Sequence, residues 1–171
     1  MFKLLRGTAF GIAIYLVCLL LHPILAQARY DVEVRGELGV EITTKAFNDA
    51  CKILAETTTY KCVKGLPPAV ALSAVLGENT WGVYLRGGRT VYLNERLVGP
   101  HFDVYAYGVL VHEMVHYISY WSKFGTDHCA DEQLAWDVFN TYVRNQNRHD
   151  LYMDNWKRGY PQCQTQKSTT E

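Results

Sequence analysis

Residues 103–121 read DVYAYGVLVHEMVHYISYW, and this stretch predicts a long helix. At about 100° per residue, its apolar stripe comprises Leu110, Val111, Met114, Val115, Ile118 and Trp121. Asp103 can cap the start of the helix, and Gly125 favours its end. The side chains of His112 and His116 lie roughly 150° from the centre of the stripe on the same geometry. We therefore expect one face of the helix to pack in a core while another presents the two histidines.

These histidines belong to a short motif, His112-Glu113-Met114-Val115-His116. Their spacing places both imidazoles on one face, one helical turn apart, where they can share a metal ion. Glu113 lies beside the first histidine and can reach a water molecule on that metal. The alternative is two histidines on a helix that binds nothing. The surrounding pattern weighs against it, because strands are predicted before the helix, a turn after it, and a third ligand beyond the turn.

The predicted third ligand is Glu132, in the first turn of a second helix expected over about residues 130–144. The apolar residues that share its face are Ala135, Trp136, Phe139 and Val143. A carboxylate on such a face needs a partner, since burying it unpaired is costly, and a metal ion would serve. Alternatively, Glu132 only favours the positive end of the helix dipole. His128, Asp131 and Asp127 are rival ligands, and His128 is the strongest of them because three histidines also bind zinc.

Strands are predicted upstream of the motif. Residues 69–76 form a short apolar run suited to a buried strand. Residues 81–85 and 90–94 are rich in aromatic and β-branched side chains, and Gly87-Gly88 between them suits a hairpin turn.

One helix is expected before these strands. Residues 29–40 show no clear pattern, but Thr43 or Thr44 can cap a helix that the β-branched run 57–59 ends. A further short helix is expected within 145–160. The predicted fold class is therefore α+β: a helix, a small mixed β-sheet with a hairpin, the motif helix and the ligand-bearing helix that follows it.

The N-terminus has the order of a secretory signal peptide. Lys3 and Arg6 supply a positive start, residues 8–21 form an apolar run, and Ala26-Gln27-Ala28 offers a cleavage site of small residues. The alternative is an uncleaved membrane anchor, because the length of the run suits both. The expected organisation is a signal peptide at 1–28, one domain at 29–163 and a polar tail at 164–171. We expect an exported protein, periplasmic or secreted.

Four cysteines follow the predicted cleavage site: Cys51, Cys62, Cys129 and Cys163. An even number in an exported chain predicts disulfides, and buried free thiols are the alternative. None of the four is spaced Cys-x-x-Cys, which argues against a thiolate zinc site. Four cysteines allow three pairings, and the sequence does not choose among them. The pairing we expect is Cys51–Cys62, which closes a local loop, with Cys129–Cys163, which would hold the tail to the ligand-bearing helix.

The charge balance bears on partners. Lys and Arg together number 17, as do Asp and Glu, so no basic surface points to nucleic acid. Membrane contact is expected only if the N-terminal segment stays uncleaved, and the sequence leaves the oligomeric state open.

The motif, with a glutamate on the following helix, resembles the zincin metallopeptidases, and more narrowly a compact, single-domain gluzincin. The likeness covers roughly residues 69–144 and includes a Glu-x-x-Ala pattern that starts at Glu132. It implies that His112, His116 and Glu132 bind Zn²⁺ and that Glu113 is the catalytic base.

Two features depart from related patterns. Many gluzincins carry an aspartate four residues after the ligand glutamate, where it orients a histidine; Trp136 holds that place here, and Asp137 comes one residue later. Metzincins need a glycine and a third histidine soon after the motif, and Ser119 and Ser122 stand there instead.

The resemblance implies a zinc-dependent hydrolase of peptide or amide bonds, a metallopeptidase in which zinc and Glu113 activate water, acting on a peptide or protein. The candidates to stabilise the oxyanion are Tyr117, His128, Tyr142, His149 and Tyr152. An extended peptide is expected to pair with an edge strand over 81–85. The alternative is a non-catalytic envelope protein that retains the motif to bind zinc or a partner. Glu113 argues against it, since a structural zinc site needs no base.

Overall fold

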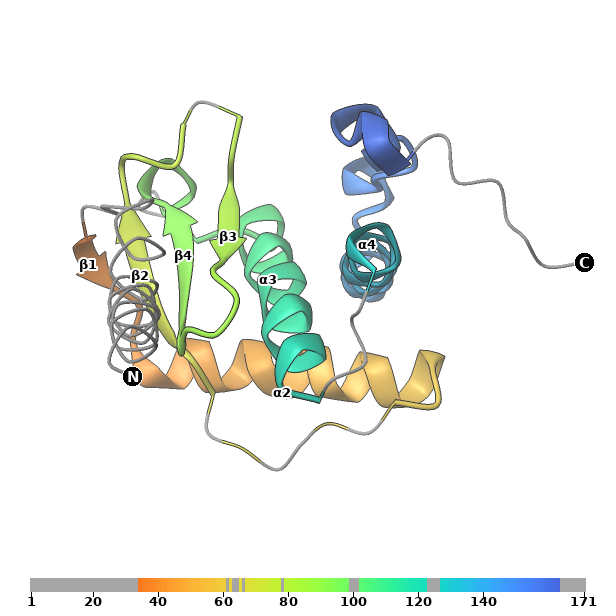
Figure 1. Cartoon of the computed structure of the whole chain (residues 1–171), viewed down its shortest axis with the longest axis horizontal. Helices are drawn as coiled ribbons and strands as arrows, with labels where there is room; N and C mark the ends of the chain where they lie inside the picture. The colour runs from red at the N-terminus through yellow and green to blue at the C-terminus, as the bar shows by residue number, and fades with distance from the viewer. Residues whose placement is uncertain are drawn as a thin grey trace, which may run out of the picture. The chain divides into compact units, whose positions relative to one another are not determined.

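The computed structural model describes residues 34–60, 62, 65, 67–77, 79–98, 102–122 and 127–163. The expected signal peptide, the polar tail and the predicted helix end at Gly125 lie outside these residues. The fold is α+β, as predicted (Figure 1). In chain order the elements are β1 (Val34–Glu37), α2 (Val40–Thr57), β2 (Ala69–Ser73), β3 (Gly82–Tyr84), β4 (Thr90–Asn94), η1 (Glu95–Leu97), α3 (Val104–Ser122), α4 (His128–Asn145), η2 (His149–Leu151), η3 (Trp156–Gly159) and η4 (Pro161–Cys163).

The strands form one mixed sheet in the order β1-β2-β4-β3. β4 pairs parallel with β2 and antiparallel with β3, which confirms the predicted hairpin. Gly87 in its turn has φ +89°, a backbone conformation that favours glycine. The predicted strand over 69–76 is too long, because the Ser73 hydroxyl accepts a hydrogen bond from the Val75 amide and turns the chain. β3 lies at an edge of the sheet, and no strand of the described chain pairs with its outer side.

The helix starts differ from the predictions at two places. α2 begins at Val40 rather than near Thr43, whose hydroxyl bonds back to the Gly39 carbonyl from within the first turn. α4 begins at His128 rather than near residue 130, because the Asp127 carboxylate accepts from the Cys129 amide and caps the helix. Capping of α3 by Asp103 is confirmed by its bond to the Ala106 amide.

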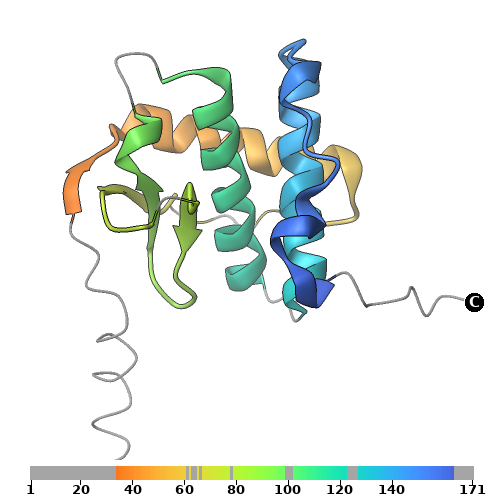
Figure 2. The same cartoon turned by 90° about the horizontal axis from the view of Figure 1, so that it is seen from above.

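The motif helix α3 lies between the sheet and α4, and α2 crosses both helices (Figures 1 and 2). This placement covers nearly every face of α3, so the predicted stripe is buried from Leu110 to Ile118. Trp121 is an exception, since 45% of it is exposed. The histidine face is buried as well, because α4 packs over it.

Close packing of α3 on α4 depends on Gly108. A Cβ at this position would lie 2.7 Å from the ring of Phe139, which is fully buried. We predict that Gly108→Ala lowers the free energy of unfolding by about 1–2 kcal/mol, since the overpacking outweighs the gain that alanine brings to a helix. Denaturant unfolding measures this change. Gly159→Ala is the control, because nothing lies within 4 Å of its Cβ position; equal midpoints for the two variants would contradict the prediction.

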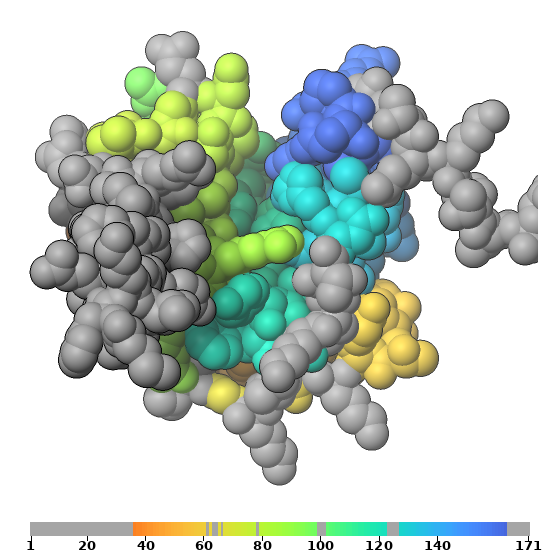
Figure 3. All heavy atoms as spheres, viewed as in Figure 1, coloured from red at the N-terminus to blue at the C-terminus, as the bar shows by residue number. Residues whose placement is uncertain are grey.

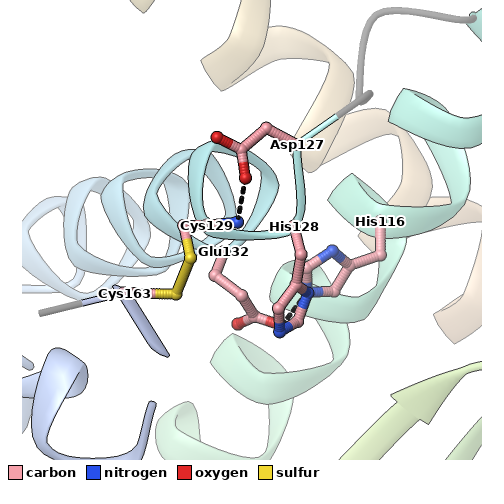
Figure 4. Close-up of a disulfide and its surroundings, with 6 residues drawn as sticks. All are labelled: His116, Asp127, His128, Cys129, Glu132 and Cys163. Atoms are coloured by element: carbon pink, nitrogen blue, oxygen red, sulfur yellow. Dashed lines mark hydrogen bonds and ion pairs between the residues drawn. A yellow bond between two sulfur atoms is a disulfide. The ribbon is translucent and has the colours of Figure 1, made fainter. Parts of the chain in front are cut away.

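Both expected disulfides are present. Cys51 bonds to Cys62 and Cys129 bonds to Cys163. The second bridge joins the first turn of α4 to the last short helix of the described chain (Figure 4). Two disulfides fit an extracellular location. In the part of the chain that the structure describes, no helix combines the length and the apolar character needed to cross a membrane.

Candidate metal centre

The structure brings His112, His116 and Glu132 together, two from α3 and one from α4. One ligand atom from each lies within 4.8 Å of the others. The Nε2 atoms of the two histidines are 3.1 Å apart. Glu132 Oε1 is 3.5 Å from His116 Nε2, and Glu132 Oε2 is 3.7 Å from His112 Nε2.

We call these three residues, His112, His116 and Glu132, the triangle. The distances between their ligand atoms match those between three ligands of one zinc ion. Ligand atoms at about 2.0–2.1 Å from a tetrahedral zinc ion lie roughly 3.3 Å from one another. Glu132 Oε2 is buried and has no hydrogen-bond partner among the described residues, although an unpaired buried carboxylate oxygen is costly. A bound cation satisfies this oxygen and both imidazole nitrogens at once. The residues therefore fit a metal ion, and their nitrogen and oxygen donors include the types that zinc accepts.

The rival ligands lie differently. His128 is half exposed, with its Nδ1 4.0 Å from Glu132 Oε1 and its ring against Tyr160. In Figure 4 the side chains of His128, Glu132 and His116 converge, while Asp127 turns away to its capping bond. His128 is not part of the triangle but stands beside it. Asp131 hydrogen-bonds to His116 and is not one of the three residues of the triangle.

Asp131 orients His116, a role that the sequence analysis did not assign. Its Oδ2 lies 2.8 Å from His116 Nδ1, so the imidazole holds its Nε2 toward the metal position. Its Oδ1 accepts a hydrogen bond from the Ser119 hydroxyl, and Arg86 lies 3.8 Å from Oδ2. Burial raises the pKa of Asp131, but the bonds to His116 and Ser119 and the Arg86 charge outweigh burial and lower it. Burial likewise lowers the pKa of His116, but Asp131 and the other nearby carboxylates raise it to about 9.

We predict that Asp131→Asn weakens zinc binding by about 10- to 100-fold, because the amide removes the charged partner that fixes His116. Competition against a chromophoric chelator measures the affinity. Asp127→Asn is a matched control, since it makes the same chemical change nearby and asparagine caps helices as well as aspartate does. Equal affinities for the two variants would show that Asp131 does not position His116.

His112 has an apolar neighbour on α4. The ring of Trp136 lies 4.3 Å from the His112 ring, centroid to centroid. Burial, with a smaller effect of His116, holds the pKa of His112 well below its usual value. A neutral imidazole is the form that binds metals.

Glu113 is buried against the edge strand. A Cβ at Gly82 would lie 2.7 Å from Glu113 Cγ, so only glycine lets β3 pass this close to the carboxylate. The Tyr84 backbone also hydrogen-bonds to Glu113. Burial raises the pKa of Glu113 to about 7; the charge of Glu132 adds to the rise, and His116 opposes it. This value suits a general base near neutral pH.

One hollow of about 300 Å³ contains the triangle, Glu113 and Tyr160. Burial raises the pKa of Tyr160, and the charges of Glu132 and Glu113 and a hydrogen bond with Glu132 raise it further, so its hydroxyl keeps its proton. The sequence analysis missed Tyr160. The signal that could have found it is Cys163, whose expected bridge to Cys129 brings this segment beside Glu132.

Of the five residues predicted to stabilise the oxyanion, only His128 lines the hollow. Tyr117 packs against Phe47 and Tyr84 in the core, and Tyr142 packs against Tyr107. Tyr152 accepts a hydrogen bond from Arg144, and His149 lies in η2.

No family model matches the chain, and no curated protein or solved structure matches it. The fold and the site therefore define the protein by themselves. It is an α+β domain with two disulfides and a buried group of two histidines and a glutamate that can hold a metal ion.

Proposed function

We propose that the protein is an exported, zinc-dependent hydrolase of peptide or amide bonds. The observation that carries this proposal is the triangle of His112, His116 and Glu132, with Glu113 in the same hollow. A structural zinc site is closed by four protein ligands and needs no carboxylate base beside it. The pattern of these residues along the chain, which resembles that of the zincins, supports the same reading.

Each group has a role in this proposal. Zinc bound by the triangle would supply Lewis acidity, which polarises the scissile carbonyl and lowers the pKa of water to near neutral. Glu113 takes the proton of the attacking water and delivers it to the leaving amine. Tyr160 keeps its proton and hydrogen-bonds to Glu132 in the metal-free site; with Glu132 bound to zinc, the same hydroxyl would donate to the oxygen on which negative charge develops. Asp131 keeps His116 in position through both steps.

The edge strand supports a peptide substrate. β3 lies beside Glu113 and has one unpaired side, so an extended peptide can add to the sheet by main-chain hydrogen bonds. Such pairing would carry the scissile bond past Glu113 and the triangle.

Export is supported by the disulfides and by the order of charged, apolar and small residues at the N-terminus. N-terminal sequencing of the protein recovered outside the cytoplasm is expected to begin at Arg29. A first residue of Met1 would contradict cleavage and favour an anchored protein.

The proposed function is tested by metal content and hydrolysis together. Purified protein with both disulfides oxidised is expected to bind one zinc ion, measured by mass spectrometry of the metal. The same preparation is expected to cleave members of a mixed peptide library, and a chelator should stop the cleavage until zinc is restored. Protein that takes up no zinc, or that binds zinc and cleaves nothing, would contradict the proposal.

A further inference from the structure

A second hollow opens from the metal centre. It measures about 700 Å³ and shares Gly82, His112, Glu113 and Tyr160 with the first hollow. The larger chamber therefore adjoins the space next to the proposed reacting atoms, and the two hollows meet at these residues.

Large aromatic side chains line much of this chamber, beside smaller polar ones such as Asn79, Thr80 and Asn155. The large residues in its walls are Trp81, Tyr105, Trp136, Met153, Trp156 and Tyr160. The rings support one another edge to face: Trp81 against Tyr105 at 6.3 Å and Trp156 against Tyr160 at 5.7 Å. Because β3, α3, α4 and the C-terminal segment each contribute a wall, the chamber is fixed by the whole fold.

In the described part of the chain, the chamber has no charged partner apart from the groups of the metal centre. Among the described residues that line it, the groups that can ionise are His112, Glu113 and tyrosine hydroxyls. The first two belong to the proposed reaction. Arg86, the basic residue of the site, lines only the first hollow. An acidic or basic side chain would lose its hydration here without gaining an ion pair, whereas an apolar side chain would be favoured.

We infer that this chamber selects the substrate: it receives a large apolar or aromatic side chain of the residue next to the scissile bond. The inference rests on the proposed hydrolysis. It requires that the reaction take place at the triangle of His112, His116 and Glu132, beside Glu113, because this is the site that the chamber adjoins. Met153 and Trp81 are specificity-determining residues in this view, and neither touches the triangle's ligand atoms.

The inference is tested with peptides that differ only in one guest residue: Phe, Leu, Ala, Asp or Lys. Wild-type protein is expected to cleave beside Phe or Leu with a kcat/KM at least about 10-fold higher than beside Ala, Asp or Lys. Met153→Lys places a cation in the wall, so the rate for the Phe peptide should fall and that for the Asp peptide should rise. Tyr152→Lys is the matched control, because it adds the same charge one residue away and does not line the chamber.

A second variant, Trp81→Ala, keeps the test decisive if Met153→Lys fails to fold. Trp81 is 39% exposed, so Trp81→Ala removes a wall without opening the core, and it should reduce the preference for Phe over Ala. Zinc stoichiometry is measured for every variant. Cleavage without preference for a large apolar residue, or a preference that both wall variants leave unchanged, would overturn the inference and leave the proposed hydrolase standing. No cleavage of any peptide by the zinc-bound protein would overturn both.

Discussion

Glu113→Gln is expected to reduce hydrolysis by at least about 10³-fold while zinc stays bound. The amide has the shape of the carboxylate and fits beside Gly82, but it cannot accept the proton of the attacking water. The triangle keeps its geometry, since Glu113 is not one of its members. Turnover of a cleaved peptide and zinc content, measured on the same preparation, separate the two effects.

Glu56→Gln is the matched control for this change, because Glu56 is exposed on α2. It should leave both the rate and the zinc content unaltered. Equal hydrolysis by wild type and Glu113→Gln would remove the catalytic role and favour the alternative, a zinc-binding envelope protein without turnover. Loss of zinc in Glu113→Gln would instead make Glu113 a ligand.

Glu132→Gln is expected to weaken zinc binding by more than about 100-fold, since the loss of a ligand costs more than the loss of a residue that orients one. The stability effect depends on zinc. With a chelator present, the variant removes a buried carboxylate that has an unpartnered oxygen, so it should unfold at the same temperature as wild type or higher. With zinc present, wild type should be the more stable protein, because ligand binding stabilises the folded state.

His128→Ala tests the rival ligand in the same assay. Its half-exposed imidazole stands beside the triangle, and its loss should change the zinc affinity by less than about 10-fold. The assignment of the third ligand would be reversed if His128→Ala released zinc and Glu132→Gln retained it.

Local signals in the sequence predicted the elements that carry the site. The Asp103 cap, the Gly87 turn and the helical spacing of His112 and His116 each depend on a few neighbouring residues, and the structure contains all of them. The expected disulfide pairs are both present, although the cysteine pattern alone does not choose among the three possible pairings.

The missed features depend on contacts between distant segments. β1 is a strand because it pairs with β2 in a register that no local pattern reveals. Asp131 bonds to His116 because α4 packs against α3 beside this histidine. Tyr160 lines the hollow because the segment after α4 folds back to Cys129. Trp121 belongs to the apolar stripe by its spacing, yet 45% of it is exposed.

The covalent tie between Cys129 and Cys163 has a consequence for when the protein can act. In Figure 3 the hairpin region, in yellow-green, reaches across α3 toward the start of α4. Arg86 in its turn lies 3.8 Å from Asp131, so one end of the cleft is built by the main body of the fold. The opposite wall, with Tyr160 and Trp156, belongs to the segment after α4, which is held by that bond, by hydrogen bonds between Asn140 and Met153, and by the burial of Trp156. Chains still reduced in the cytosol would hold the metal-binding trio with this wall less firmly tied. Maturation would then coincide with arrival in an oxidising space.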